Sequence, residues 1–251
     1  MLPVFRKIRK QLADENRFLQ YSRYAVGEIV LVVIGILIAL QVNNWNEERK
    51  EDILEQKILT EIARNIDLDL NEIRHDISLM DSVNAACQRI LNHLEHLAEP
   101  SYEFEYDMAT IRANPHFDPN KSGYSLLVSK GVEIVKNDSL RELISVLYES
   151  NYPYYKRYEE ERTQFKIQHI YPRLLSYTAL EYRPDLVLRA VATVSQMDYE
   201  ILRTSESFFK FVRATSYENS MVQDRARVIE KRILGLKGLL ERELPDQKAE
   251  D

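Results

Sequence analysis

Two hydrophobic patterns follow one another along the first hundred residues. Residues 29–40 form an unbroken apolar run, IVLVVIGILIAL. Residues 54–94 instead carry apolar side chains at steps of three and four, which is typical of one face of a helix. No Gly or Pro interrupts residues 36–99. We therefore predict one long helix from about Glu47 to Leu97, continuous with the apolar run.

The next segment predicts a connection made of short elements. Residues 100–123 contain three prolines and an alternating run, Tyr102–Met108, which predicts a short edge strand. A short helix is expected over residues 124–129. It should end at Gly131, because glycine readily adopts the left-handed conformation found at helix C-termini.

A second long helix follows this connection. The capping box Ser139–Glu142 predicts its start, and apolar and aromatic positions continue the helical pattern to about Tyr177. Pro153 and Pro172 each lack a backbone N–H donor. We therefore expect a kink at each proline.

The C-terminal part predicts a short helix and then a third long one. Arg183–Asp185 contains a proline at an early position and predicts the short helix. The apolar spacing predicts the long helix over Thr204–Leu244, and Pro245 should end it. Gly235 and Gly238 inside it predict close packing against a neighbouring helix.

These elements define the predicted fold class, which is all-α. A single N-terminal transmembrane helix continues into an antiparallel helical bundle of three long helices plus short helices. The predicted organisation is a basic cytoplasmic segment (1–23), the transmembrane helix (24–45) and a periplasmic helical-bundle domain (46–251).

The transmembrane assignment depends on length and on the ends of the apolar run. Residues 24–45 would span about 33 Å as a helix, enough for a hydrocarbon core of about 30 Å. Tyr24 and Trp45 lie where interfacial aromatic residues are expected. A cleaved signal peptide is the alternative, but no small-x-small cleavage site follows the run. We expect an uncleaved anchor.

Charge predicts the orientation of this anchor. Residues 1–23 hold six Lys/Arg against two acids, whereas residues 46–251 hold 28 Lys/Arg against 37 acids. Short basic flanks stay in the cytoplasm. We therefore expect a single-pass protein of the inner (cytoplasmic) membrane with its C-terminal domain in the periplasm. Because only about 23 residues precede the anchor, an accessory subunit or adaptor is expected rather than a self-contained receptor.

One face of the anchor differs from ordinary lipid-facing surface. Glu28, Val32, Gly35 and Ala39 follow at steps of four, three and four, so they share one helix face. Gly35 and Ala39 allow close helix approach, and the ionisable Glu28 should face protein or water. We predict a transmembrane association face for a second copy or another membrane protein. Alternatively, the Glu28 carboxylate reaches the membrane surface and the small residues have no such role.

Three sequence blocks resemble a known family. They are FRKIRKQL at residues 5–12, YAVGEIVLVVIGILIALQVNNWNEERK at 24–50 and SGYSLLVSKGVEIVKNDSLRELISVLYES at 122–150. They resemble DUF6090, a family of uncharacterised membrane proteins from Bacteroidota. The resemblance extends to about Arg173, and the last helix is similar only in general helical character. It implies the N-terminal anchor and a periplasmic far side, but no activity, substrate or catalytic residues.

Composition and motifs give little support for catalysis. The net charge of −6 argues against nucleic acid as the main partner, and the single cysteine, Cys87, excludes an internal disulfide. Residues 118–123 imitate part of an EF-hand loop, but Ser129 stands where a bidentate Glu is required. His93 and His96 are three residues apart and are expected to be surface histidines. We predict no catalytic residue, no metal site and no cofactor.

A tyrosine cluster is the remaining candidate surface. Tyr148, Tyr152 and Tyr155 share one stripe and are expected in the core, whereas Tyr154 and Tyr158 fall on another face. Tyrosine gives a large amphipathic contact area at low entropic cost. Tyr154 and Tyr158 are therefore a possible partner-binding or glycan-binding pair, and a polar-tipped bundle face is the alternative.

The function expected from these features is that of a non-enzymatic, membrane-anchored adaptor whose bundle binds a partner protein. Its partners would be the lipid bilayer and either a second copy or another membrane protein, with no nucleic acid. The alternatives are a periplasmic ligand-sensing module that signals through a partner membrane protein, and a hydrolase with an unrecognised site. Glu28 also motivates a homo-oligomeric channel.

Overall fold

The computed structural model describes residues 18–244, and 82% of them are helical against 4% in strands, which confirms the all-α class. The predictions for the basic segment before Phe18 and for Pro245 lie outside the described residues. In chain order the elements are α2 (Phe18–His96), α3 (Tyr102–Thr110), α4 (Ser122–Lys130), η1 (Val132–Ile134), α5 (Asp138–Val146), η2 (Leu147–Asn151), α6 (Tyr152–Phe165), η3 (Lys166–Ile170), α7 (Tyr171–Tyr177), β1 (Ala179–Tyr182), β2 (Ala190–Thr193), α8 (Gln196–Thr204) and α9 (Glu206–Glu243).

The chain divides into two compact units, with the boundary after Glu55. Helix α2 runs through this boundary. This confirms the prediction that the apolar run and the amphipathic stretch belong to one helix. In the first unit, residues 29–53 of α2 are all exposed.

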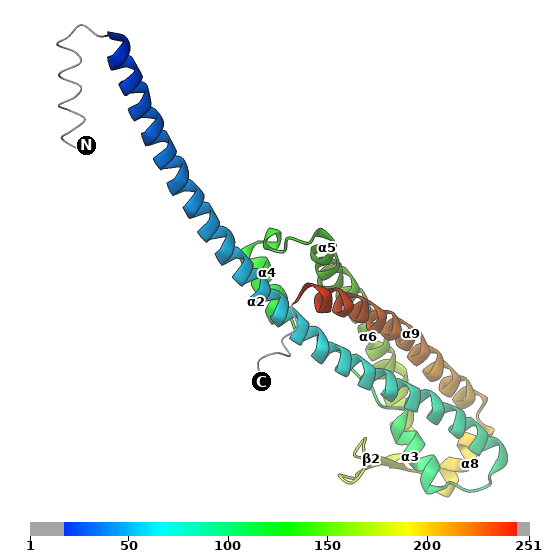
Figure 1. Ribbon diagram of the computed structural model, residues 1–251. Coiled ribbons are helices and arrows are strands. Elements are labelled where there is room, and N and C mark those ends of the chain that lie inside the picture. The colour runs from blue at the N-terminus through cyan, green and yellow to red at the C-terminus, as the bar shows by residue number, and fades with distance from the viewer. Residues whose placement is uncertain (1–17, 245–251) are drawn as a thin grey trace. The chain divides into compact units, whose positions relative to one another are not determined.

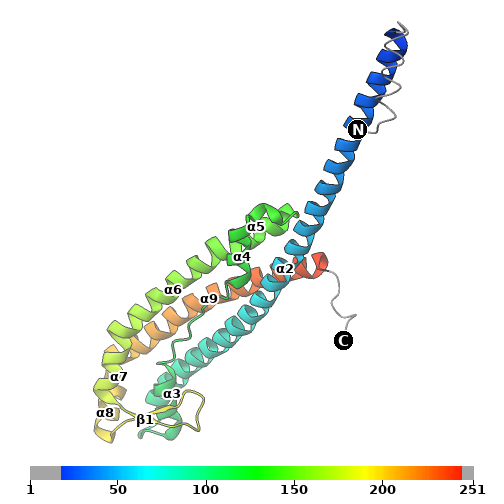
Figure 2. The same cartoon turned by 90° about the vertical axis from the view of Figure 1, so that its left-hand side faces the viewer.

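The second unit is a bundle in which α2 beyond residue 56 lies alongside α6 and α9 (Figures 1 and 2). The expected apolar stripe of α2 is buried from Ile58 to Leu94, and α9 buries a matching stripe from Phe208 to Leu240. Both stripes follow the helical repeat, so each helix turns one continuous apolar face inward. The predicted third long helix is confirmed to within two residues at its start and one at its end.

The directions of the helices follow from their pairings. Helix α9 runs antiparallel to α2, as expected, because Lys237 pairs with Asp67 whereas Asn219 pairs with Asn84 further along α2. Helix α6 instead runs parallel to α2. Their contacts advance together, from Asp69 with Tyr152 at one end to Met80 with Arg162 at the other. The chain achieves this because the connection 97–137 runs back along the bundle.

The strand predicted over Tyr102–Met108 is wrong, since these residues form α3. The Ser101 hydroxyl caps this helix by accepting a bond from the Phe104 N–H at 3.2 Å, and acids in the first turn favour the positive end of the helix dipole. Phe104 and Met108, four residues apart, are both buried. The alternation of apolar and polar residues concealed this helical pair.

The short helix predicted at Arg183–Asp185 is also wrong. These residues begin the turn of a hairpin in which β1 pairs antiparallel with β2, from Ala179 opposite Thr193 to Tyr182 opposite Ala190. A bond from the Arg183 N–H to the Arg189 carbonyl oxygen, at 2.9 Å, closes the turn. Strand β2 packs against α3 and buries Val191 and Ala192. These buried side chains hold the hairpin against the bundle.

The helical segment 138–177 departs from regular α-helix geometry next to both prolines, where a departure was predicted. The departure takes the form of a widened π-helical turn before each proline. The π-helical turns η2 and η3 end immediately before Tyr152 and Tyr171. The N–H groups of these two tyrosines donate to the carbonyl oxygens five residues earlier, those of Leu147 and Lys166. This spacing accommodates Pro153 and Pro172, which cannot donate to the helical ladder. The start also differs from the prediction: Asn137, rather than Ser139, caps α5.

Among the described glycines, Gly123 is the one that packs closely against a neighbouring helix, and the glycines of α9 do not. A Cβ atom at Gly123 would lie 2.7 Å from the backbone nitrogen of Ile62, whereas at Gly235 or Gly238 it would meet nothing within 4 Å. The predicted close packing in α9 is therefore wrong. The predicted end of α4 is confirmed, because Gly131 follows its last residue with a φ of 98°.

We expect Gly123→Ala to lower the free energy of unfolding by about 1–3 kcal/mol, because the added methyl would force α4 away from the α2 backbone. Gly238→Ala, in an open helical position, is the matched control and should raise it by about 0.5–1 kcal/mol. Urea denaturation followed by circular dichroism measures both. Equal effects of the two substitutions would contradict the close contact at Gly123.

Candidate functional site

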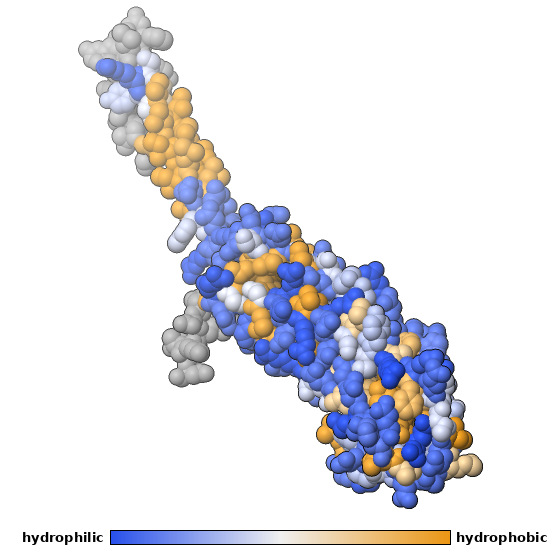
Figure 3. Space-filling view, turned by 90° about the vertical axis from the view of Figure 1, so that its right-hand side faces the viewer, coloured by the Kyte–Doolittle hydropathy of each residue, from blue (hydrophilic) through white to orange (hydrophobic). Residues whose placement is uncertain are grey.

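The most unusual surface of the described chain is the apolar part of α2. An 18-residue window of this helix has a mean hydropathy of 2.6, and none of the window is buried within the protein. Figure 3 shows it as a hydrophobic band, in contrast to the mainly hydrophilic surface of the bundle. By length and composition, α2 is long and apolar enough to cross a membrane.

The four residues of the predicted association face all lie in this part of α2. Val32 is 54% exposed, Ala39 is exposed and Glu28 is partly exposed. A Cβ atom at Gly35 would meet nothing within 4 Å. The four positions therefore have room for a neighbouring helix. Their role in association stays a prediction.

The tyrosines separate as the helical spacing predicts. Tyr148, Tyr152 and Tyr155 are buried, at 4% exposure or less, whereas Tyr154 is 48% exposed. The hydroxyl groups of Tyr154 and Tyr158 lie 2.9 Å apart, and the guanidinium of Arg225, from α9, lies 3.6 Å from the centre of the Tyr158 ring. Tyr158 is thus partly covered, and Tyr154 offers the larger open surface.

A buried polar cluster accompanies the core tyrosines and was not predicted. Arg162 and Lys166 are each 1% exposed. Arg162 donates to the carbonyl oxygen of Pro115, and Lys166 donates to that of Ala113. These acceptors lie on the irregular connection between α3 and α4. The two cations therefore fix that segment against the interior of the bundle.

Two acids complete the cluster. Glu159 of α6 is 1% exposed, and its Oε1 accepts from the Phe117 N–H at 3.1 Å. Its Oε2 lies 3.6 Å from Nδ1 of His116. Asp76 of α2 is 4% exposed, and a charge interaction links it to both Glu159 and Arg162. Carboxylates from two helices thus meet the cations inside the bundle.

Burial controls the protonation of this cluster. It raises the pKa of Asp76 to about 6, with a further contribution from Glu72, and raises the pKa of Glu159 to about 7. Burial also lowers the pKa of Lys166 to about 7, and the neighbouring charge of Arg162 acts in the same direction. The cluster can therefore exchange protons near neutral pH.

Two atoms of the cluster, Asp76 Oδ2 and Arg162 Nε, lack a hydrogen-bond partner within residues 18–244, whereas the Tyr155 hydroxyl interacts with the Glu159 carboxylate. Unpaired polar atoms in an interior are costly, so these two atoms reduce what the cluster contributes to stability.

Helical spacing could have revealed the cluster. The stripe of core tyrosines continues from Tyr155 to Glu159, Arg162, Lys166 and Ile170 at steps of four, three, four and four. Lysine, arginine and glutamate are rarely fully buried, so their charge argues against a core position even where the helical spacing predicts one. The periodicity was the stronger signal.

The remaining motifs have structural partners. In the EF-hand-like loop, the Asn120 N–H donates to Asp69 and the Gly123 N–H donates to Asn65, so α2 holds the loop. His93 Nε2 lies 3.0 Å from the Glu99 carbonyl oxygen. His93 is 9% exposed, which contradicts its prediction as a surface residue, whereas His96 is exposed. Cys87 is buried as expected, and burial raises the pKa of its thiol to about 12.

One comparison with known proteins gives a match. The model of DUF6090, a family of unknown function, matches residues 28–174. The chain belongs to this family. No curated protein and no solved structure matches the chain. The DUF6090 match begins at Glu28 and ends within α7, so it includes the buried cluster and the tyrosine pair but not α9.

Replacing Glu159 by Gln should change how stability depends on pH. Its pKa is raised from 4.5 to about 7 in the folded protein. The stability gained from this raised pKa is present below pH 4.5 and is lost as the pH rises through 7. Relative to wild type, Glu159→Gln should therefore gain up to roughly 3 kcal/mol in free energy of unfolding between pH 4.5 and 8.

Urea denaturation of the full chain across this pH range measures the difference. Glu160→Gln, at an exposed neighbouring position, is the control. A difference between wild type and Glu159→Gln that stays constant with pH would contradict the raised pKa of Glu159.

Proposed function

We propose that this chain is a membrane-anchored adaptor that works by association rather than by catalysis. The observation that carries the proposal is the exposed apolar run of α2. Ten of its twelve residues are Ile, Leu or Val. Each contributes about 0.3–0.6 kcal/mol to insertion at a helix centre, so the run favours a bilayer by roughly 3–6 kcal/mol. In water the same exposed surface would drive aggregation.

In this proposal residues 24–45 form the anchor and cross the inner membrane of a Bacteroidota host. The basic segment 1–23 stays in the cytoplasm, because short flanks rich in Lys and Arg are retained there. The bundle, residues 46–251, lies in the periplasm. A contact made by the bundle can then be coupled to a contact made within the membrane.

Two surfaces support association. Within the membrane, Glu28, Val32, Gly35 and Ala39 present one face with space for a second helix. On the bundle, Tyr154 presents an open aromatic surface beside Tyr158, and the guanidinium of Arg157 lies 5.1 Å from the Tyr154 ring centre. Aromatic and arginine side chains are enriched in protein interfaces. The proposed partner is a second copy or another membrane protein.

A second candidate function is ligand sensing with signal transfer to a partner membrane protein. Two observations favour it: the protonatable cluster inside the bundle and an open cavity beside α3. Either could couple a change in the surroundings to the arrangement of the helices.

The anchor surface is tested by Gly35→Leu. The added side chain fills the small position and should separate the helices, so recovery of the partner or of the oligomer should fall at least fivefold. The full chain with a C-terminal tag is pulled down in mild detergent and weighed by native mass spectrometry. Val33→Leu, on another face of α2, is the matched control. Equal recovery from both variants would remove the association face from the proposal.

The same pull-down tests the bundle surface. Tyr154→Ala should reduce recovery of a second protein, whereas Tyr217→Ala, at an exposed tyrosine of α9, should not. Loss with Tyr217→Ala alone would place the contact elsewhere on the bundle.

A further inference from the structure

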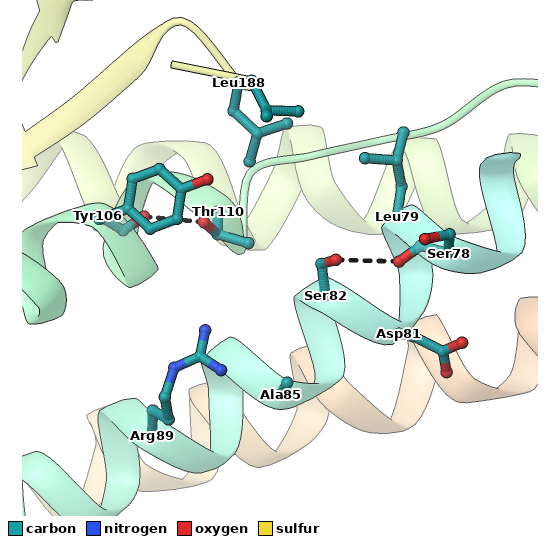
Figure 4. A pocket seen from close by; sticks show the side chains of 10 residues that line it. Ser78, Leu79, Asp81, Ser82, Ala85, Arg89, Tyr106, Thr110 and Leu188 are labelled. Carbon is teal, nitrogen blue, oxygen red and sulfur yellow. Dashed lines mark hydrogen bonds between the residues drawn. The ribbon is translucent and has the colours of Figure 1, made fainter.

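A cavity of about 460 Å³ opens between α2, α3 and the turn that joins β1 to β2. Figure 4 shows side chains from these three elements around it, with Tyr106 and Thr110 facing Ser82 and Leu79. Ligand pockets of small molecules have volumes of roughly 300–1,000 Å³. The cavity is therefore large enough for a molecule of about the size of a mono- or disaccharide.

Hydroxyl groups dominate its polar lining. Ser82 Oγ donates to the Ser78 carbonyl oxygen, so the Ser82 hydroxyl oxygen can still accept, whereas Thr110, which donates to the Tyr106 carbonyl oxygen, is only 2% exposed. The Tyr106 hydroxyl, which Figure 4 shows turned toward the cavity, has no protein hydrogen-bond partner among residues 18–244. The cavity thus offers both donors and acceptors.

The charges at the cavity are already neutralised. Nε and Nη2 of Arg89 donate to the two oxygens of Asp107, at 2.9 and 2.6 Å. Asp81 accepts from Gln223 at 2.6 Å and pairs with Arg227 at 3.3 Å. A charged ligand would find no uncompensated opposite charge, so a neutral ligand fits better. Nη1 of Arg89 is left as one further donor.

Apolar groups complete the lining. Leu79 lies on the α2 side, and Val187 and Leu188 come from the hairpin turn. Val187 is 78% exposed, so its side chain is accessible at the mouth of the cavity. Together with the Tyr106 ring they provide surfaces for the C–H faces of a sugar ring, whose hydroxyl groups would meet the serine and tyrosine oxygens.

We propose that this cavity binds a small neutral carbohydrate. The combination of hydroxyl donors and acceptors, an aromatic ring, apolar side chains and compensated charges matches the chemistry of an uncharged sugar. The proposal is independent of the anchor and of the adaptor function, since every lining residue lies in the second unit.

The test uses the full chain in a detergent without sugar headgroups. Cellobiose, maltose and N-acetylglucosamine are titrated separately in ligand-observed saturation-transfer NMR, with glucuronate as the charged comparison. At least one neutral sugar should bind saturably and at least tenfold more tightly than glucuronate. No saturable binding of any of the three, or equally tight binding of glucuronate, would overturn the proposal.

Two substitutions locate the site. Ala85→Trp fills the cavity from α2 and should abolish binding, whereas Asn71→Trp, exposed elsewhere on α2, should not. Tyr106→Phe removes one hydroxyl and should weaken binding about three- to tenfold, with Tyr217→Phe as its control. Circular dichroism verifies that each variant is folded. Unchanged sugar binding by folded Ala85→Trp would overturn the assignment to this cavity.

Discussion

Two buried cations constrain the bundle. A positive charge removed from water is destabilising by several kcal/mol unless oxygen atoms surround it. Arg162 and Lys166 find these oxygens on the connection between α3 and α4, at Pro115 and Ala113. These contacts hold the part of the connection around Ala113 and Pro115 against the bundle interior. The connection returns the chain to the start of the bundle, so that α6 runs parallel to α2.

The same cluster places acidic groups beside these cations inside the bundle. Glu159 and Asp76 enter it from α6 and α2, and burial raises the pKa of both carboxyl groups. Removing one partner from a buried charge pair is strongly destabilising, because it leaves the other charge uncompensated. The contacts of this cluster join α6 to α2 at Met80 and to the connection at Pro115 and Phe117. The cluster also gives the bundle groups whose charge changes near neutral pH.

The regular parts of the fold could be predicted because periodicity and burial agree there. The stripe from Ile58 to Leu94 and the stripe of α9 each follow one helical repeat. Prediction failed where local chemistry outweighed pattern. The Ser101 cap turned an alternating run into α3, and the hairpin replaced a helix at Arg183 because β2 buries Val191 against α3.

The candidate site was predicted less well than the fold. The exposure of Tyr154 and the burial of Tyr152 followed from helical spacing, but the partners of Tyr158 and Arg162 come from distant parts of the chain. Sequence spacing within one helix contains no information on such partners. The same holds for Gly123. A side chain is excluded at this position only because α4 packs against the backbone of Ile62 in α2, and the sequence does not show that contact.

The proposed adaptor function depends on α2 crossing a membrane with the bundle on the far side. The most direct measurement joins a reporter to the C-terminus in the living host. Alkaline phosphatase, active only outside the cytoplasm, should be active in this fusion, and a fluorescent protein that matures only in the cytoplasm should stay dark. A fluorescent and phosphatase-inactive C-terminus would contradict the proposed orientation and, with it, the periplasmic adaptor.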